Sequence, residues 1–235
     1  MQDQLITTAD VAEHKMGKHP RGLYVLFFTE MWERFGYYLM IGIFLLYLTD
    51  TTSHGGRGLD NVSAISIVGT YVAFIYLTPF IGGLIADRYL GYIKSIFLGG
   101  GLLALGYFLI AMNGSNVVMY SGLFFAIIGN GFFKPNISTL LGNIYNRPDL
   151  KPKKDVAYNI FYMGINIGAF ICNFVAAFLR NNYSWGYAFS AAGFGMLLGL
   201  IWFAFGLRHV KKADIIKPVQ KEDMPLSKIG MYVFL

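Results

Sequence analysis

Six long apolar stretches alternate with short polar breaks along the chain. Each stretch has close to the ~20 residues that a helix needs to cross the hydrocarbon core of a bilayer. None alternates strictly between apolar and polar residues, as a barrel strand would, so the pattern predicts helices. The predicted spans are 23–48, 62–86, 93–112, 117–141, 156–179 and 186–207. We therefore expect an all-α membrane protein with six transmembrane helices.

The composition excludes a soluble domain. Of the 235 residues, 55% are hydrophobic and only 14% are charged, whereas soluble domains average roughly 25% charged residues. The single cysteine, Cys172, excludes a disulfide framework and a thiolate metal cluster. The four histidines lie outside the spans without a ligand-spaced companion, so we expect no metal site and no membrane-enzyme centre.

The basic residues predict the orientation. Fifteen of the 19 lysines and arginines flank one set of helix ends, and the positive-inside rule then places both termini in the cytoplasm. Because these residues are scattered over membrane-flanking loops, we expect anionic lipid headgroups as partners and no nucleic acid. The expected location is the plasma membrane, which is the inner membrane if the source is bacterial.

The ends of the chain differ from the bundle at 23–207. Residues 1–22 are polar and lack the apolar core of a signal peptide, so we interpret them as a cytoplasmic tail. Residues 208–235 begin as a basic linker and turn apolar again in the segment LSKIGMYVFL. We interpret this segment as the start of a further helix at which the sequence is cut.

The first span contains three charged residues near its middle, Glu30, Glu33 and Arg34. Each charge costs about 2.5–3.5 kcal/mol at that depth if it faces lipid. Together with Tyr37 and Tyr38 they fall within about 140° on a helical wheel, which makes a polar stripe that must face protein or water. Glu30 and Arg34 are four residues apart with the acid first, the favourable order for an ion pair.

Three other spans add polar groups. The fourth span has Lys134 beside Pro135, and the second has Tyr71 and Tyr76. In the fifth span four polar residues cluster within about 60° of one another; they are Asn159, Tyr162, Asn166 and Asn173. The pattern predicts a hydrated cavity. The cavity contains two glutamates, one arginine and one lysine, whose charges sum to zero. An anionic group that enters the cavity therefore favours protonation of a glutamate.

Structural interpretations of the same residues stay open. The charges of the first span are also compatible with a buried ion-pair network that fixes helix packing. Lys134 is compatible with a lysine that snorkels to the interface, Asn166 with a hydrogen bond between helices, and the tyrosines with aromatic packing. Gly195 and Gly199 form a GxxxG pair, which we interpret as close helix packing.

The segment EMWERFGYY at 30–38 resembles the ExxERFxYY signature of the proton-dependent oligopeptide transporter family, within the major facilitator superfamily. Three further segments resemble motifs of that family in the same order. They are GGLIADRYLG at 82–91, FFKPN at 132–136 and FYMGINIGAF at 161–170. The resemblance implies the N-terminal half of the superfamily fold, a 3+3 inverted repeat, and it implies that a C-terminal six-helix half is missing from this sequence.

The resemblance also implies symport of di- and tripeptides with protons by alternating access, with the proton as coupling ion and no cofactor. It implies a proton-coupling cluster of Glu30, Glu33 and Arg34 with Lys134 as salt-bridge partner. The implied peptide-binding residues are Arg34 and Lys134 for the carboxylate, Asn166 for the amino end, and Tyr37, Tyr38 and Tyr76 along the pocket wall. Asp87 and Arg88 match the gating and topology motif.

Two other classes of function remain as alternatives. Relatives with this fold move nitrate or other small anions, and a cavity with Arg34 and Lys134 would accept those too. A truncated membrane module without transport activity is the second. A passive channel is disfavoured because the sequence has neither rings of like charge nor repeated carbonyl filters.

Overall fold

A computed structural model describes residues 18–215 as a bundle of six long helices with no strand among them. The long helices are α2 (Arg21–Thr49), α3 (Asn61–Ile85), α4 (Tyr92–Ala111), α5 (Asn116–Ile144), α6 (Lys154–Asn182) and α7 (Trp185–Val210). Each begins and ends within three residues of its predicted span, so the prediction of six long helices is confirmed. Most of the predicted tail and linker, and the predicted start of a further helix, lie outside the described residues.

Five of the six helices are long and apolar enough to cross a membrane by length and hydropathy. The exception is α2, which has 29 residues and is roughly 43 Å long at 1.5 Å per residue. Its length suffices for a span, but Glu30, Glu33 and Arg34 interrupt its apolar sequence. The arrangement is that of a multi-pass membrane protein whose most polar helix is packed among the others.

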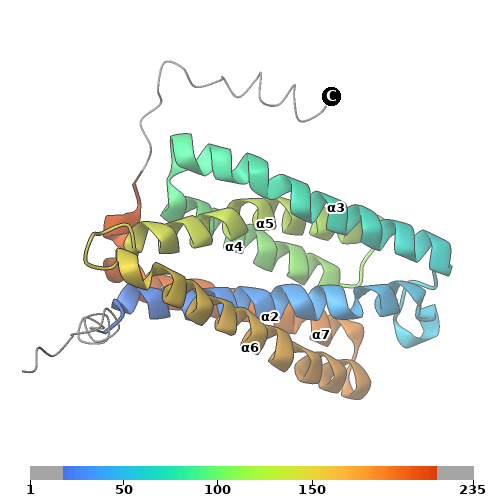
Figure 1. Cartoon of the computed structure of the whole chain (residues 1–235). Coiled ribbons are helices and arrows are strands. Elements are labelled where there is room, and N and C mark those ends of the chain that lie inside the picture. Colours follow the sequence, from blue (N-terminus) through green and yellow to red (C-terminus); the bar gives the residue numbers. More distant parts are fainter. Residues whose placement is uncertain (1–17, 216–235) are drawn as a thin grey trace, which may run out of the picture.

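The helices pack as an ordered series (Figure 1). Helix α2 contacts both α6 and α7, α7 contacts α4, α4 packs along α5, and α5 contacts α3. Helices α3 and α6 lie at opposite flanks of the bundle. Of the 25 residues of α3, only Ala64, Tyr71, Ile75 and Gly82 are buried. Much of the surface of α3 and α6 is therefore left uncovered by residues 18–215.

Glycines set the closest helix contacts. A Cβ atom at Gly82 of α3 would lie 2.1 Å from the Gly131 carbonyl oxygen of α5, so these backbones touch directly. At Gly195 of α7 an added Cβ would lie 2.6 Å from the Phe35 ring of α2. Small residues let helix backbones approach closely in membranes. The interpretation of the GxxxG pair in α7 as a packing feature agrees with this contact.

The helical path extends beyond the second predicted span. The helical path continues past α3 through a wider, π-type turn at Ala86–Leu90, which contains Asp87 and Arg88. The chain leaves this path only at Gly91, whose φ of 77° suits a residue without a side chain. Charged residues indicated a break, but in this chain they lie on the last turn of the helical rod.

A polar network joins the loops at one end of the bundle. Asp50, which follows α2, accepts hydrogen bonds from Arg180 Nη2 at 2.9 Å and from Trp185 Nε1 at 3.0 Å. Arg57 in the same loop donates to the carbonyl oxygen of Gly114, in the loop after α4, at 2.7 Å. The loops after α2, α4 and α6 thus share one end of the bundle, and the basic loops after α3 and α5 are at the other.

Candidate functional site

The charged residues of α2 form one buried cluster. Arg34 Nε lies 3.2 Å from Glu30 Oε1, and the same nitrogen donates to Glu33 Oε2. None of the three side chains is more than 5% exposed. The predicted Glu30–Arg34 pair is confirmed, and Glu33 is a second acceptor for the same guanidinium. Two carboxylates thus share one arginine in a place without bulk water, where a change of charge is costly.

Tyrosines continue the cluster along α2. The Tyr37 ring centroid lies 5.0 Å from Arg34 Cζ, within range of a cation–π contact. The rings of Tyr37 and Tyr38 meet edge to face at 5.2 Å. Tyr37 is buried and Tyr38 is half-buried. The predicted polar stripe of α2 therefore passes from buried ions to a partly accessible ring.

Lys134 lies near the middle of α5, beside Pro135, and is half-buried. Its Nζ lies 4.9 Å from the centroid of the Tyr76 ring on α3, so Lys134 and Tyr76 are brought together. The charge of Lys134 acts on both glutamates and on Arg34. Within the described residues, however, the ion pairs of the glutamates closer than 4.0 Å are with Arg34, and none is with Lys134. The implied salt bridge is a longer-range interaction in this structure.

The polar stripe of α6 faces away from the six-helix unit. Its residues Asn159, Tyr162, Asn166 and Asn173 are all exposed. Asn173 donates a hydrogen bond to the Ala169 carbonyl oxygen of its own helix at 3.3 Å. Within residues 18–215 Asn166 forms no hydrogen bond with a side chain of another helix. The structure thus places Asn166 on an open face beside α2 and does not join it to the buried cluster.

The other predicted site residues fall into two groups. Tyr76 is 66% exposed, and its ring contacts Lys134. Tyr71 is 2% exposed and packs against Phe44. Asp87 and Arg88 lie on the π-type turn at the end of α3, and both take part in interactions there. They belong to the end of the bundle and lie apart from the charged cluster in its middle.

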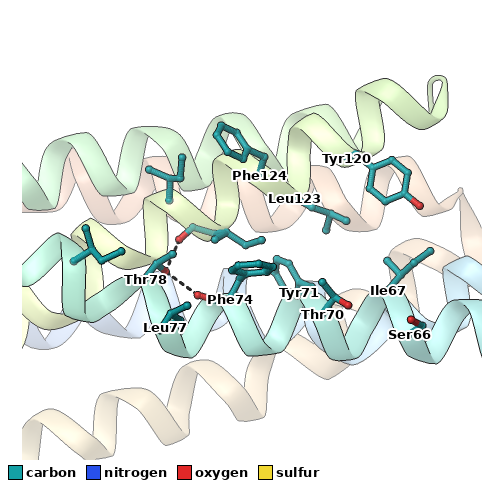
Figure 2. Close-up of a pocket in the computed structure, with 13 residues that line it drawn as sticks. Ser66, Ile67, Thr70, Tyr71, Phe74, Leu77, Thr78, Tyr120, Leu123 and Phe124 are labelled. Atoms are coloured by element: carbon teal, nitrogen blue, oxygen red, sulfur yellow. Dashed lines mark hydrogen bonds between the residues drawn. The ribbon is translucent and has the colours of Figure 1, made fainter. Parts of the chain in front are cut away.

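Several hollows open on the surface of the described bundle. A groove of about 570 Å³ runs between α3 and α5 and is lined mostly by apolar side chains (Figure 2). At its edge Thr78 donates hydrogen bonds to the carbonyl oxygens of Phe74 and Ile127, each at 3.0 Å. A smaller hollow of about 450 Å³ lies beside Asp50 and Arg180 at one end. Neither is lined by the charges of α2, so neither replaces the cluster as the candidate site.

Sequence reasoning missed several polar contacts. Tyr107 of α4 lies against Gly36, where an added Cβ would be 3.2 Å from its ring. Asp214, which follows α7, accepts hydrogen bonds at the start of α4. Tyr107 is one polar residue in an apolar span, and Asp214 lies in a polar tail, so no periodic pattern distinguishes them. For the contacts of Asp50 with Arg180 and Trp185, the sequence offered one signal, an acidic residue directly after a span.

Fold and site together define a multi-pass helical membrane protein with a charged cluster buried in its first helix. The sequence profile of the POT family matches residues 93–227, which is more than half of the chain. The protein belongs to the POT family. Among the six helices the match includes the lysine of α5 and the polar stripe of α6.

Individual relatives agree with this assignment. The chain is 40% identical over 193 residues to a di-/tripeptide transporter of Lactococcus lactis subsp. lactis, covering 81% of this chain and 38% of that protein. It is 38% identical over 218 residues to an uncharacterized transporter of Bacillus subtilis, covering 92% of this chain and 44% of the relative. The chain thus spans less than half the length of these relatives.

Solved structures show the same fold. A POT family transporter in complex with 5-aminolevulinic acid matches with a TM-score of 0.82 and 36% identity, over 92% of this chain and 44% of that one. A peptide transporter POT in complex with sulfate matches with a TM-score of 0.81 and 34% identity, over 92% and 44%. The prediction of one half of a transporter fold agrees with these coverages.

Proposed function

We propose that this chain forms the N-terminal half of a proton-coupled symporter for di- and tripeptides, a transporter and not an enzyme. The observation that carries the proposal is the buried cluster in which Glu30 and Glu33 share Arg34. Two carboxylates beside one fixed cation, with Lys134 nearby, form a set whose charges cancel. A peptide carboxylate that approaches Arg34 and Lys134 competes with the glutamates, and a proton on one glutamate restores neutrality.

The proposed peptide site follows from the positions of the surrounding groups. Arg34 and Lys134 receive the carboxylate, and Tyr37, Tyr38 and Tyr76 line the pocket. Asn166 on the open face of α6 holds the peptide's amino end. These groups lie on four helices around the uncovered side of α2, as expected for a central site in a secondary transporter.

A C-terminal six-helix half completes the proposed pathway. The uncovered surfaces of α3 and α6 support this, because a lipid environment does not satisfy the exposed asparagines of α6. In this arrangement both termini are in the cytoplasm of a cell whose plasma membrane holds the protein, and Asp87 and Arg88 act at the cytoplasmic gate. Alternation of the two halves around the fixed site then gives access from each side in turn.

Transport of another small anion is a second candidate. It is favoured by the two cations, Arg34 and Lys134, which recognise negative charge without selecting a peptide. The two candidates differ in the role of Asn166, because a simple anion has no amino end to hold. Competition between a dipeptide and nitrate for uptake separates them.

The decisive experiment uses the native gene product reconstituted in liposomes, after its intact mass has shown whether a second half is encoded with this one. An inward proton gradient should concentrate a labelled dipeptide, and Glu33→Gln should abolish that accumulation. Asp149→Asn, which changes an exposed acid paired with Arg147, is the matched control. Accumulation that survives Glu33→Gln contradicts the coupling role of the cluster.

A further inference from the structure

Five buried polar atoms in and around the α2 cluster have no hydrogen-bond partner within the described residues. One is Glu30 Oε2. The other four belong to Tyr107 and to three residues that interact with it electrostatically; they are Glu33 Oε1, Arg34 Nη2, Tyr71 Oη and Tyr107 Oη. None of the four residues is more than 4% exposed. Buried polar groups are nearly always paired, and an unpaired one costs about 1–3 kcal/mol. Four such atoms in one region indicate a small polar ligand that the side chains themselves do not replace.

The four groups come from three helices to one place. Tyr107 of α4 interacts electrostatically with Tyr71, Glu33 and Arg34. Its ring reaches α2 because Gly36 has no side chain, and a Cβ there would lie 3.2 Å from Tyr107 Cε2. Tyr71 approaches from α3 and is 6.1 Å from Phe44, centroid to centroid. Helix α3 therefore reaches the cluster through Tyr71, and α4 reaches it through Tyr107.

The chemistry of the four atoms selects the ligand. The arginine nitrogen can only donate, an ionised carboxylate oxygen can only accept, and each tyrosine hydroxyl can do either. Water both donates and accepts, and a buried water makes about 2–4 hydrogen bonds. An anion would leave the carboxylate oxygen unsatisfied, and a cation would leave the arginine nitrogen unsatisfied. Water fits the whole set.

We propose that ordered water is bound between α2, α3 and α4, and that Tyr71 and Tyr107 are positioning residues that hold it against Glu33. The hydroxyls and the water can reverse the direction of their hydrogen bonds. The same site therefore serves Glu33 whether it is ionised or protonated. In a proton symporter this would lower the free-energy difference between the two forms, a consequence that rests on the proposed function.

Other charged and titratable groups surround Glu33. They are Glu30, Arg34 and Tyr37 on α2, Tyr71 on α3, Tyr107 on α4 and Lys134 on α5. Lys134 lies against the Tyr76 ring, and both residues belong to the proposed peptide pocket. Arg34 belongs both to the water site and to that pocket, whereas the buried Tyr71 and Tyr107 belong to the water site alone.

The test separates proton coupling from substrate movement in the native gene product. Tyr107→Phe removes only the hydroxyl. We expect proton-driven dipeptide uptake to fall about tenfold, while counterflow exchange of labelled for unlabelled dipeptide without a gradient stays within about twofold. Tyr47→Phe is the matched control, since this buried hydroxyl donates to Asn113 Oδ1 at 2.6 Å near the far end of α2. A packing role for Tyr107 would instead lower both rates together.

Each outcome has a defined meaning. Wild-type protein without gradient-driven uptake contradicts the proposed function, but the water site then remains testable in an experimental structure that resolves ordered water beside Tyr107 and Glu33. If Tyr107→Phe does not fold, Tyr71→Phe is measured in the same two assays. Unchanged uptake in a folded variant, or a resolved structure without water bonded to these groups, overturns the inference.

Discussion

The carboxylate of Asp214 accepts a hydrogen bond from the backbone N–H of Tyr92 at 2.7 Å, across 122 residues of sequence. The N–H of Ile93 points to the same oxygen at 3.3 Å. The residue in the capping position of α4 is Gly91, which has no side chain to cap the helix. Asp214, which is distant in sequence, thus supplies the acceptor that α4 lacks locally. The segment that follows α7 is fastened to the turn that contains Asp87 and Arg88.

Asp214→Ala should destabilise the bundle. The variant leaves N–H groups at the start of α4 without an acceptor and removes a negative charge from the positive end of the helix dipole. We expect a loss of about 1 kcal/mol, which corresponds to a Tm lower by about 2–4 °C for a domain of this size. Thermal unfolding in detergent measures it. Asp149→Ala, in an exposed pair with Arg147, is the control, and an equal loss there would contradict the capping role.

Gly82→Ala should separate α3 from α5. The added methyl group would lie 2.1 Å from the Gly131 carbonyl oxygen, a contact that only a shift of backbone can relieve. Overpacking of this kind costs about 1–3 kcal/mol or more. Gly69→Ala on the same helix is the matched control, because an added Cβ there meets nothing within 4 Å. Comparable Tm values for the two variants would show that the contact is not as close as described.

The free energy of unfolding should decrease as the pH becomes more acidic, because of His19 at one end of the bundle. His19 Nδ1 is 2.6 Å from the Tyr145 hydroxyl, and burial raises the pKa of Tyr145 to about 12, so the hydroxyl stays protonated. Burial and the charge of Lys153 lower the pKa of His19 below its usual 6.5. The stabilising contribution is therefore complete above pH 6.5 and decreases as pH falls below that value.

Thermal unfolding at a series of pH values from about 8 to 5 measures this effect. The Tm of the wild type should decrease toward the acidic end, and His19→Gln should remove that part of the slope. Tyr145→Phe should lower the Tm mainly at the neutral end, where the hydrogen bond is intact. An identical slope in His19→Gln would assign the pH dependence to other groups.

Asn166→Ala should weaken peptide binding without uncoupling transport. The residue is exposed on the face of α6 that the proposed pocket uses. Loss of one hydrogen bond to a charged amino group should raise the half-saturation concentration about tenfold. Asn159→Ala, an exposed residue of the same polar stripe two turns away, should change it less than about twofold. Equal half-saturation concentrations in wild type and Asn166→Ala would return Asn166 to a structural role.

The sequence predicted the elements well and the contacts between them poorly. Hydropathy locates a span because each helix must be apolar over its full length, and the polar residues of α2 stand out against that background. The Glu30–Arg34 pair was predictable because helical spacing alone brings the two side chains together. Asp50 and Arg180 are 130 residues apart, and no local rule connects them.

The sequence also did not predict which face of each helix points outward. The stripe of α6 and the charges of α2 appear alike as polar positions on a helical wheel. Packing separates them, since α2 lies between α6 and α7, while the stripe of α6 is turned outward. Tyr71 and Tyr76 illustrate the same point on one helix, where the first is buried and the second covers Lys134. A helical wheel gives the angular position of a residue on its own helix, whereas the packing of the bundle determines which helix that residue faces.

The charged cluster of α2 has a consequence for biogenesis. Helix α2 is synthesised before the other five, yet it is the one that fails the hydropathy criterion for a span. Its three charges would cost roughly 8–10 kcal/mol if they entered lipid unpaired. The two helices that pack most extensively on it, α6 and α7, are the last to emerge among the six. The first helix therefore reaches its final environment only when the last two join it, so insertion and folding of this unit are completed together.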